Sequence, residues 1–351
     1  MSAVLRKNLL NDLRGTFTMN NDHNEFLFDE EKTKKIMKKA KLWSTLKVIA
    51  ITMIVTPIII VIFWYGLRNL SLNSAQKVMD DIRIYNEISS PNVQMSDQIY
   101  DYHLFGGKIK TTTYKVFGDN YRPYIWEPLE SDYNLLGTLT RNYVSDSIQM
   151  QSSESLAEAN QFEKFNVYTG DREMFFYHPD ISYNVYKDNM SELEQFRDTT
   201  LIELGISFDK AYHYDEIKSK LPSEVQLNWL WVDTYTTERL DFMRQDQNTI
   251  TANSPFIYGI QSEQSKPIFA QYEGDEVERF IRNIELLLKS KNFEWESNQL
   301  YQSLVGENGT LENNDVKIIG AVVTGTPEQL ASLQGQTYIK ASTFGVIFDR
   351  K

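Results

Sequence analysis

The chain has 351 residues, with 36 Lys and Arg against 48 Asp and Glu, which gives a formal net charge of −12. It contains no cysteine, which excludes disulfides, thiol nucleophiles and thiolate metal sites. The excess of acid argues against nucleic acid as a direct ligand, because phosphate binding depends on Lys and Arg.

The most informative segment is an uncharged run of twenty residues from Val48 to Leu67. At about 1.5 Å per residue, a helix of this length crosses the roughly 30 Å hydrocarbon core of a bilayer. A cleaved signal peptide is the alternative, but Asn73, Ser74 and Ala75 are the nearest approach to a cleavage site. We therefore predict a retained transmembrane helix over residues 48–67.

The charges on the two sides of this run differ in sign. Residues 1–47 hold ten Lys and Arg against six Asp and Glu, a net of +4, whereas residues 69–351 hold 25 against 42, a net of −17. Because Lys and Arg near a span resist translocation, we predict a single-pass cell-membrane protein with a cytoplasmic N-terminus and an extracytoplasmic C-terminal part. The basic leader also suits contact with anionic lipid in the bilayer.

These features divide the chain into four predicted regions. The cytoplasmic leader (1–47) is too small to fold alone, so any function there is binding, and Met19 is an alternative start. The transmembrane helix (48–67) follows. A membrane-proximal extracytoplasmic region (68–195) then leads to a C-terminal domain (196–351).

The membrane-proximal region starts with a predicted helix from Ser71 to Ile88, which Pro91 ends. From Val93 to about Phe117 the alternating pattern predicts strands that turn at Gly106 and Gly107. The polar segment 149–160 is predicted to be a surface loop or a short helix.

The last 150 residues show clearer periodicity. Ile202, Leu204, Ile206 and Phe208 alternate with Glu203, Gly205 and Ser207, which predicts a half-buried strand. The same pattern predicts further strands at 225–231, 316–324 and 338–348, a short helix at 215–221 and an amphipathic helix at 277–288. Thr326, Pro327 and Gln329 form a helix N-cap with a capping box. The predicted fold class is α+β, with a mixed or antiparallel sheet and packed helices.

One motif raises the possibility of catalysis. Ser207 to Lys210 matches S-x-x-K, which requires a serine at a helix start so that the lysine one turn later reaches its oxygen. Here the serine is predicted to end a strand, and Val323-Thr324-Gly325 lacks the lysine of K-T-G. We predict no catalytic residues and no enzyme activity.

The sequence also predicts no metal and no cofactor. The chain has four histidines, His23, His103, His178 and His213, and no two of them have metal-binding spacing. Each histidine is interpreted as a surface or packing residue. The segment 320–326 lacks the G-K-[ST] ending of a phosphate loop. Arg172 is interpreted as a turn residue, with anion binding as the alternative.

Trp229, Trp231 and Tyr235 belong to the densest aromatic cluster of the chain. Alternation places both tryptophans on one face of a strand, where core packing is the default. A ligand groove in the outer domain is the alternative.

Several segments together resemble a known family. The segments 206–212, Leu221-Pro222, 229–235 and 320–326 resemble the C-terminal domain of the sigma factor regulator family, and Phe28-Asp29-Glu30-Glu31 with the lysine run resembles its N-terminal domain. Members are membrane-bound anti-sigma factors of Bacillus-type bacteria. The resemblance implies that the leader holds an extracytoplasmic-function sigma factor inactive and that the outer domain receives an envelope signal.

The chain departs from many anti-sigma factors in having no cysteine for a cytoplasmic zinc domain. The 47-residue leader must then bind sigma, with help from a membrane partner protein as an open alternative. Phe26, Leu27 and Phe28 are the apolar side chains we expect at the sigma interface, with lipid contact as the alternative.

Two further questions stay open at this point. Thr52, Thr56 and Pro57 weaken the span helix and could admit an intramembrane protease, although such residues are also tolerated in spans. The rival function is an anchored extracytoplasmic cell-envelope enzyme or ligand-binding protein.

Overall fold

The computed structural model describes residues 30–103, 105–117, 122–143, 147–150, 162–246, 251–252, 257–265, 274–306 and 308–349. The chain divides into two compact units, residues 1–64 and residues 65–351. They are treated separately below.

The described part of the first unit is a single helical segment, the beginning of α2 (Glu30–Ser89). Among the described residues, α2 is the one helix long and apolar enough to cross a membrane. The helix continues through Pro57. The hydroxyl of Thr52 donates to the carbonyl oxygen of Val48 over 2.8 Å, so this hydroxyl has its hydrogen-bond partner within the helix. The predicted helix over 48–67 is confirmed and continues on both sides.

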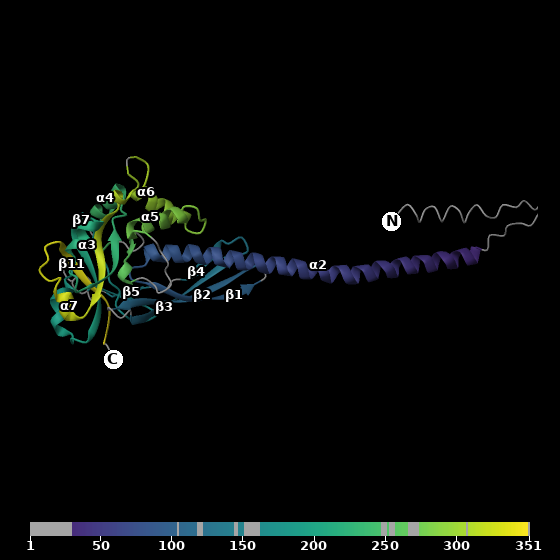
Figure 1. Cartoon of the computed structure of the whole chain (residues 1–351), viewed down its shortest axis with the longest axis horizontal. Helices are drawn as coiled ribbons and strands as arrows, with labels where there is room; N and C mark the ends of the chain where they lie inside the picture. Colours follow the sequence, from purple (N-terminus) through teal and green to yellow (C-terminus); the bar gives the residue numbers. More distant parts are fainter. Residues whose placement is uncertain are drawn as a thin grey trace, which may run out of the picture. The chain divides into compact units, whose positions relative to one another are not determined.

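The second unit contains the end of α2 and an antiparallel four-stranded sheet, here called the juxtamembrane sheet (Figure 1). Its strands follow chain order: β1 (Gln94–His103), β2 (Gly106–Phe117), β3 (Arg122–Asn134) and β4 (Leu139–Tyr143). The predicted hairpin is confirmed, but Gly106 and Gly107 are the first residues of β2, paired with His103 and Tyr102, rather than the turn itself. Position 106 requires glycine, because φ is +152° and a Cβ there would lie 2.0 Å from the carbonyl oxygen of Tyr133.

A five-stranded sheet, here called the C-terminal sheet, has the order β11-β7-β10-β8-β9. Its strands are β7 (Thr200–His213), β8 (Gln226–Val232), β9 (Tyr258–Gln261), β10 (Lys317–Gly325) and β11 (Ile339–Asp349). All neighbouring pairs are antiparallel. With the packed helices this is an α+β fold, as predicted.

A short ribbon pairs β5 (Ser147–Met150) with β6 (Glu163–Asn166). The predicted loop at 149–160 is therefore wrong at its first two residues, which belong to β5, and residues 151–160 lie outside the described residues.

Shorter α-helices in the described part of the second unit are α3 (Tyr214–Lys220), α4 (Thr237–Gln245), α5 (Glu276–Leu287), α6 (Glu294–Leu304) and α7 (Pro327–Ala331). Single 3-10 turns lie at η2 (Asn189–Gln195), η4 (Glu263–Ser265) and η5 (Asn313–Asp315). The capping box of α7 is present, with Thr326 and Gln329 bonding to each other's backbone. The amphipathic pattern of α5 is also confirmed, since Val277, Phe280 and Ile284 are buried.

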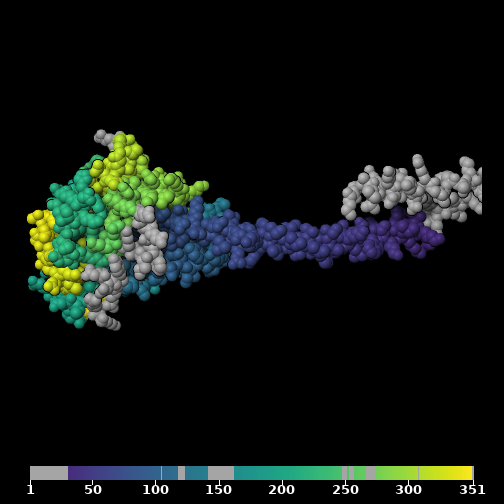
Figure 2. All heavy atoms as spheres, viewed as in Figure 1, coloured from purple at the N-terminus to yellow at the C-terminus, as the bar shows by residue number. Residues whose placement is uncertain are grey.

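The end of α2 belongs to the main hydrophobic core of the second unit. Its buried residues there are Ala75, Val78, Met79, Ile82 and Ile88, which join side chains of the C-terminal sheet in one cluster. Figure 2 shows the blue end of α2 against the atoms of the sheets. Both regions predicted on either side of residue 195 therefore contribute to one core, and the boundary itself stays a prediction.

The expectation that β7 is half-buried is wrong. Glu203 and Ser207 are no more than 1% exposed, and Gly205 is also buried, next to Met174. A second layer of chain covers this face, and the polar side chains bond within it rather than to water.

We predict that Met79→Ala lowers the free energy of unfolding of the second unit by about 2–5 kcal/mol, because it removes a buried side chain that the core cannot refill. Tryptophan fluorescence of the full-length protein during denaturant unfolding measures this loss. The matched control, Gln76→Ala on the exposed face of α2, should change it by less than about 0.5 kcal/mol. Equal effects of the two variants would contradict the placement of α2 in the core.

Candidate functional site

A buried polar network joins the end of α2, the juxtamembrane sheet and the C-terminal sheet; we call it the α2 seam. At its centre, Nζ of Lys115 on β2 lies 2.7 Å from Oε2 of Glu203 on β7. The two side chains are 3% and 0% exposed. Nζ of Lys115 also lies 4.1 Å from the ring centroid of Trp126. A buried ion pair of this kind must have all its partners in place, because an unpaired buried charge is costly.

The remaining partners of Glu203 come from elements far apart in the chain. Asn92, in the turn after α2, donates its amide to Oε1 over 2.8 Å, and the backbone N–H of Val346 on β11 donates to Oε2 over 3.2 Å. Asn228 on β8 donates to the Asn92 side chain over 2.9 Å and accepts from Thr324 on β10 over 2.9 Å. One carboxylate thus connects α2 with both sheets.

Two further contacts fix α2 along its length. Arg279 on α5 lies 2.8 Å from the carboxylate of Glu87 on α2, with both side chains largely buried. Asp81 accepts from Ser290 over 2.5 Å and from Asn292 over 2.7 Å, both in the loop after α5. The outer end of α2 is therefore held to the C-terminal domain by polar contacts as well as by core packing.

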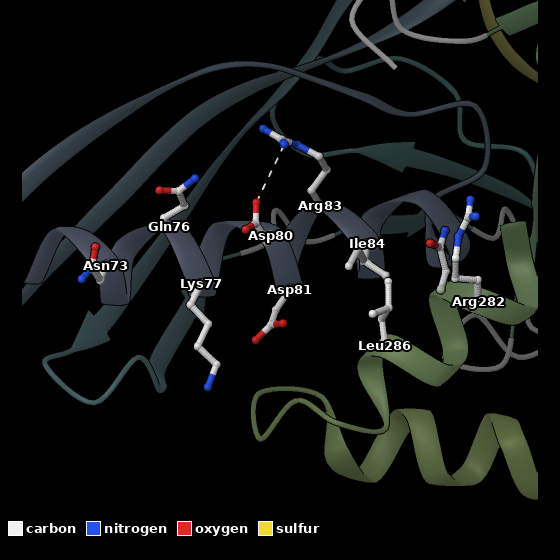
Figure 3. Close-up of a pocket in the computed structure, with 10 residues that line it drawn as sticks. Asn73, Gln76, Lys77, Asp80, Asp81, Arg83, Ile84, Arg282 and Leu286 are labelled. Carbon is white, nitrogen blue, oxygen red and sulfur yellow. Dashed lines mark ion pairs between the residues drawn. The ribbon is translucent and has the colours of Figure 1, made fainter. Parts of the chain in front are cut away.

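A groove of about 930 Å³ lies between α2 and α5 (Figure 3). Its lining residues are Asn73, Gln76, Lys77, Asp80, Asp81, Arg83, Ile84, Arg282, Asn283 and Leu286. The charges are mixed, and Asp80 lies 4.0 Å from Arg83 on the side facing away from Asp81. Asp81, which accepts hydrogen bonds from Ser290 and Asn292, is also one of the lining residues of this groove.

The sequence analysis missed the α2 seam. Lys115 and Glu203 lie 88 positions apart, so no local spacing marks them as partners. The available signal was Glu203, a single acidic residue between the apolar residues of β7. In the sequence alone, such a residue looks the same as one that faces solvent, because the layer that covers it comes from distant parts of the chain.

The predicted aromatic site lies in a second core cluster. Trp229 and Trp231 are fully buried and Tyr235 is 7% exposed, and the ring of Phe176 packs against both tryptophans. His178 belongs to this cluster as a packing histidine, with Nε2 3.2 Å from Oδ1 of Asp233. Core packing is confirmed for the two tryptophans, and a ligand groove at these residues stays a prediction.

Neighbouring tyrosines are held neutral by burial. Burial raises the pKa of Tyr177 to about 12, although its hydroxyl accepts from the backbone N–H of Lys187. The hydroxyl therefore remains an un-ionised packing group across the physiological range.

The S-x-x-K motif does not form a nucleophile. Ser207 lies inside β7 rather than at its end, is 1% exposed, and accepts from the backbone N–H of Tyr177 over 2.9 Å. Lys210 is three positions along the same strand, so the two side chains point to opposite faces. It is exposed, whereas the serine is buried.

The other residues predicted from the sequence to have a role lie outside the described residues or on the surface. Phe26, Leu27 and Phe28 lie outside the described residues, as does His23. His103 and His213 are exposed, and Arg172 lies 3.8 Å from Glu163 as an ion-pair partner in the turn. Among the residues that the structure describes, no cluster of three or more His, Asp or Glu could hold a metal ion.

The fold and site define an α+β protein with a candidate membrane helix, the C-terminal end of which, from Ala75 to Ile88, packs in the core of the second unit. Comparison with protein families gives two matches: the sigma factor regulator N-terminal domain over residues 34–121 and the sigma factor regulator C-terminal domain over residues 193–346. The chain belongs to the sigma factor regulator family, which is a regulatory family, and it is a membrane anti-sigma factor. A search of curated proteins found no match, and a search of solved structures also found none.

The α2 seam joins the two matched regions. Asn92 and Lys115 lie in the N-terminal match, whereas Glu203, Asn228 and Thr324 lie in the C-terminal match. The part of the N-terminal match beyond residue 64 and the C-terminal match are therefore joined within the second unit.

We predict that Glu203→Gln or Lys115→Met alone costs about 3–5 kcal/mol of unfolding free energy, because each leaves a buried partner uncompensated. The double variant should cost less than the sum of the two, which a double-mutant cycle by chemical denaturation measures. The matched control is the half-buried pair of Lys108 and Glu130 in the same sheet, which water still reaches, so that Lys108→Met should cost under about 1 kcal/mol. Strict additivity at the buried pair would contradict the assigned coupling.

Proposed function

We propose that the leader, residues 1–47, holds an extracytoplasmic-function sigma factor inactive and that the outer domain responds to an envelope signal. The observation that carries this proposal is that α2 is assigned as one helix from Glu30 to Ser89, with its outer end packed in the core.

The proposed orientation rests on charge. Seven lysines lie between residues 32 and 47, and the second unit carries the excess of acid. Positive residues near a span are retained in the cytoplasm, which places the leader with the sigma factor and the acidic domain outside.

Transmission is proposed to run through α2 as a conformational change. The contacts of Asp81, Glu87 and Asn92 hold the helix at three successive heights, so a rearrangement of the C-terminal sheet acts on the helix directly. Proteolysis within the span, near Thr52, Thr56 and Pro57, is the second proposed route. A membrane partner protein that strengthens the grip of the short leader is compatible with either route.

We predict that the triple variant Phe26→Ala, Leu27→Ala, Phe28→Ala weakens sigma binding by about 2 kcal/mol or more, or about 30-fold, because apolar anchors dominate such interfaces. The measurement is expression from a sigma-dependent promoter in cells. We expect this expression to rise in the triple variant, and to rise also when residues 1–42 are deleted. The matched control replaces three other apolar leader residues, Leu9, Leu10 and Phe17, with Ala and should retain repression at equal membrane abundance. If the deletion leaves repression intact, the chain acts wholly outside the cell, as an anchored enzyme or ligand-binding protein would.

We also predict the topology, using the absence of cysteine in the natural chain. In intact protoplasts, a membrane-impermeant thiol reagent should label Asn308→Cys, in an exposed loop, and should not label Ser2→Cys until the membrane is permeabilised. Labelling of both sites, or of Ser2→Cys alone, in intact protoplasts would contradict the proposed orientation.

A further inference from the structure

Two hairpin tips of the juxtamembrane sheet carry no charge, although the region from 69 to 351 holds 25 basic and 42 acidic residues. The sequence from Tyr102 to Gly107 is uncharged between Asp101 and Lys108. The sequence from 133 to 140 is uncharged between Asp132 and Arg141. Both tips carry a large apolar side chain immediately before a glycine.

These apolar side chains are exposed on the surface of the second unit. Phe105, in the turn between β1 and β2, is 71% exposed, and Leu136, in the turn between β3 and β4, is 82% exposed. Tyr102 at the end of β1 is 45% exposed. Exposed apolar groups on adjacent loop tips mark a contact surface more readily than scattered single residues do.

Hydrogen bonds place both tips beside the first turns of α2 after the apolar run. The hydroxyl of Ser71 donates to the carbonyl oxygen of Gly106 over 3.1 Å. The hydroxyl of Ser74 donates to the carbonyl oxygen of Leu135 over 2.5 Å. The two tips therefore contact neighbouring turns of the same helix.

The contacts along β1 show which way the hairpins point. Asn86 of α2 donates to the carbonyl of Val93, and Arg83 donates to the side chain of Gln98. Proceeding back along the helix, Ser71 meets Gly106 beyond the end of β1. β1 thus runs back along α2 toward the apolar run, as Figure 1 shows, and its tip is the end nearest Leu67.

The height of the tips relative to a bilayer follows from helix geometry. Ser71 is four residues beyond Leu67, which is about 6 Å along a helix axis. The headgroup region adds about 5–8 Å on each side of the hydrocarbon core. The Phe105 tip, beside Ser71, therefore falls at the depth of the lipid headgroups. The Leu136 tip lies beside Ser74, seven residues or about 10 Å beyond Leu67, at the outer edge of that layer.

We propose that Phe105 and Leu136 insert into the lipid headgroup region around the exit of the span, so that the outer domain rests on the membrane surface through two hairpin tips. The occupant we propose is lipid, because the tips contact the first turns of α2 after the apolar run and carry no Lys, Arg, Asp or Glu that would pair with a protein partner. Aromatic and aliphatic side chains next to uncharged backbone suit this interface, whereas the acidic remainder of the domain is kept off an anionic surface. The proposal depends on the membrane helix and not on sigma binding.

Single-cysteine variants of the full-length chain test this in lipid discs that hold one copy each. Phe105→Cys and Leu136→Cys carry a fluorophore whose emission is quenched by doxyl-labelled lipids or by aqueous iodide. The matched control is Ile125→Cys, because Ile125 is an apolar residue of the same sheet that is 69% exposed. It lies nine residues before Asn134, which places it about 30 Å along β3 from the hairpin tip. Unchanged tryptophan emission shows that each variant is folded.

The expected result is several-fold stronger quenching by doxyl lipids at both tips than at Ile125→Cys, with the reverse order for iodide. Equal doxyl quenching at all three positions, with full access to iodide, would overturn the proposal. Shielding of the tips from both quenchers would also overturn it, because another part of this chain would then cover them. If the tips insert only in native membranes and not in discs of purified lipid, a membrane protein rather than lipid is the partner.

Discussion

The structure depends on one buried charge pair, Lys115 with Glu203. Burying two charges is favourable only when hydrogen bonds meet the remaining lone pairs and protons, and here Asn92 and the backbone of Val346 supply them. These groups come from β2, β7, β11 and the turn after α2, so the pair is complete only when all four have docked. Asn92 itself has a φ of +54°, a left-handed conformation that asparagine tolerates better than most residues. The network therefore specifies how the membrane helix is seated, beyond any stability it adds.

This arrangement explains how the C-terminal end of α2 becomes part of the core of the second unit. Apolar packing alone would let α2 slide or rotate, since Ala, Val, Met and Ile side chains make contacts of little directionality. Charged and amide groups at Asp81, Glu87 and Asn92 each require one geometry. A change in the second unit that breaks one of these contacts leaves an unpaired polar group, which favours discrete states over gradual movement.

Local patterns predicted most of the elements and little of the site. The period of Ile202 to Phe208 identified a strand, the spacing of Val277 to Leu287 identified a helix, and Thr326 with Gln329 identified a helix start, because each signal lies within a few residues. Alternation also placed Trp229 and Trp231 together correctly. It could not show that the Glu203 face of β7 is covered, because the covering residues are Lys115 and the segment around Tyr177. The α2 seam is a property of tertiary contacts, and no window of one strand contains it.

The juxtamembrane sheet connects the hairpin tips with the α2 seam. β2 runs from Gly106, at the hairpin tip beside Ser71, to Lys115 in the α2 seam. Nine residues of extended chain cover about 30 Å, and pairing with β1 and β3 stiffens them along this length. A strand held at both ends resists stretching, so a displacement of the tip relative to α2 must be accommodated by bending of the sheet or by loss of the Lys115 contact. Because the buried pair tolerates little misalignment, the sheet makes the seating of α2 sensitive to the position of the tips at the helix exit.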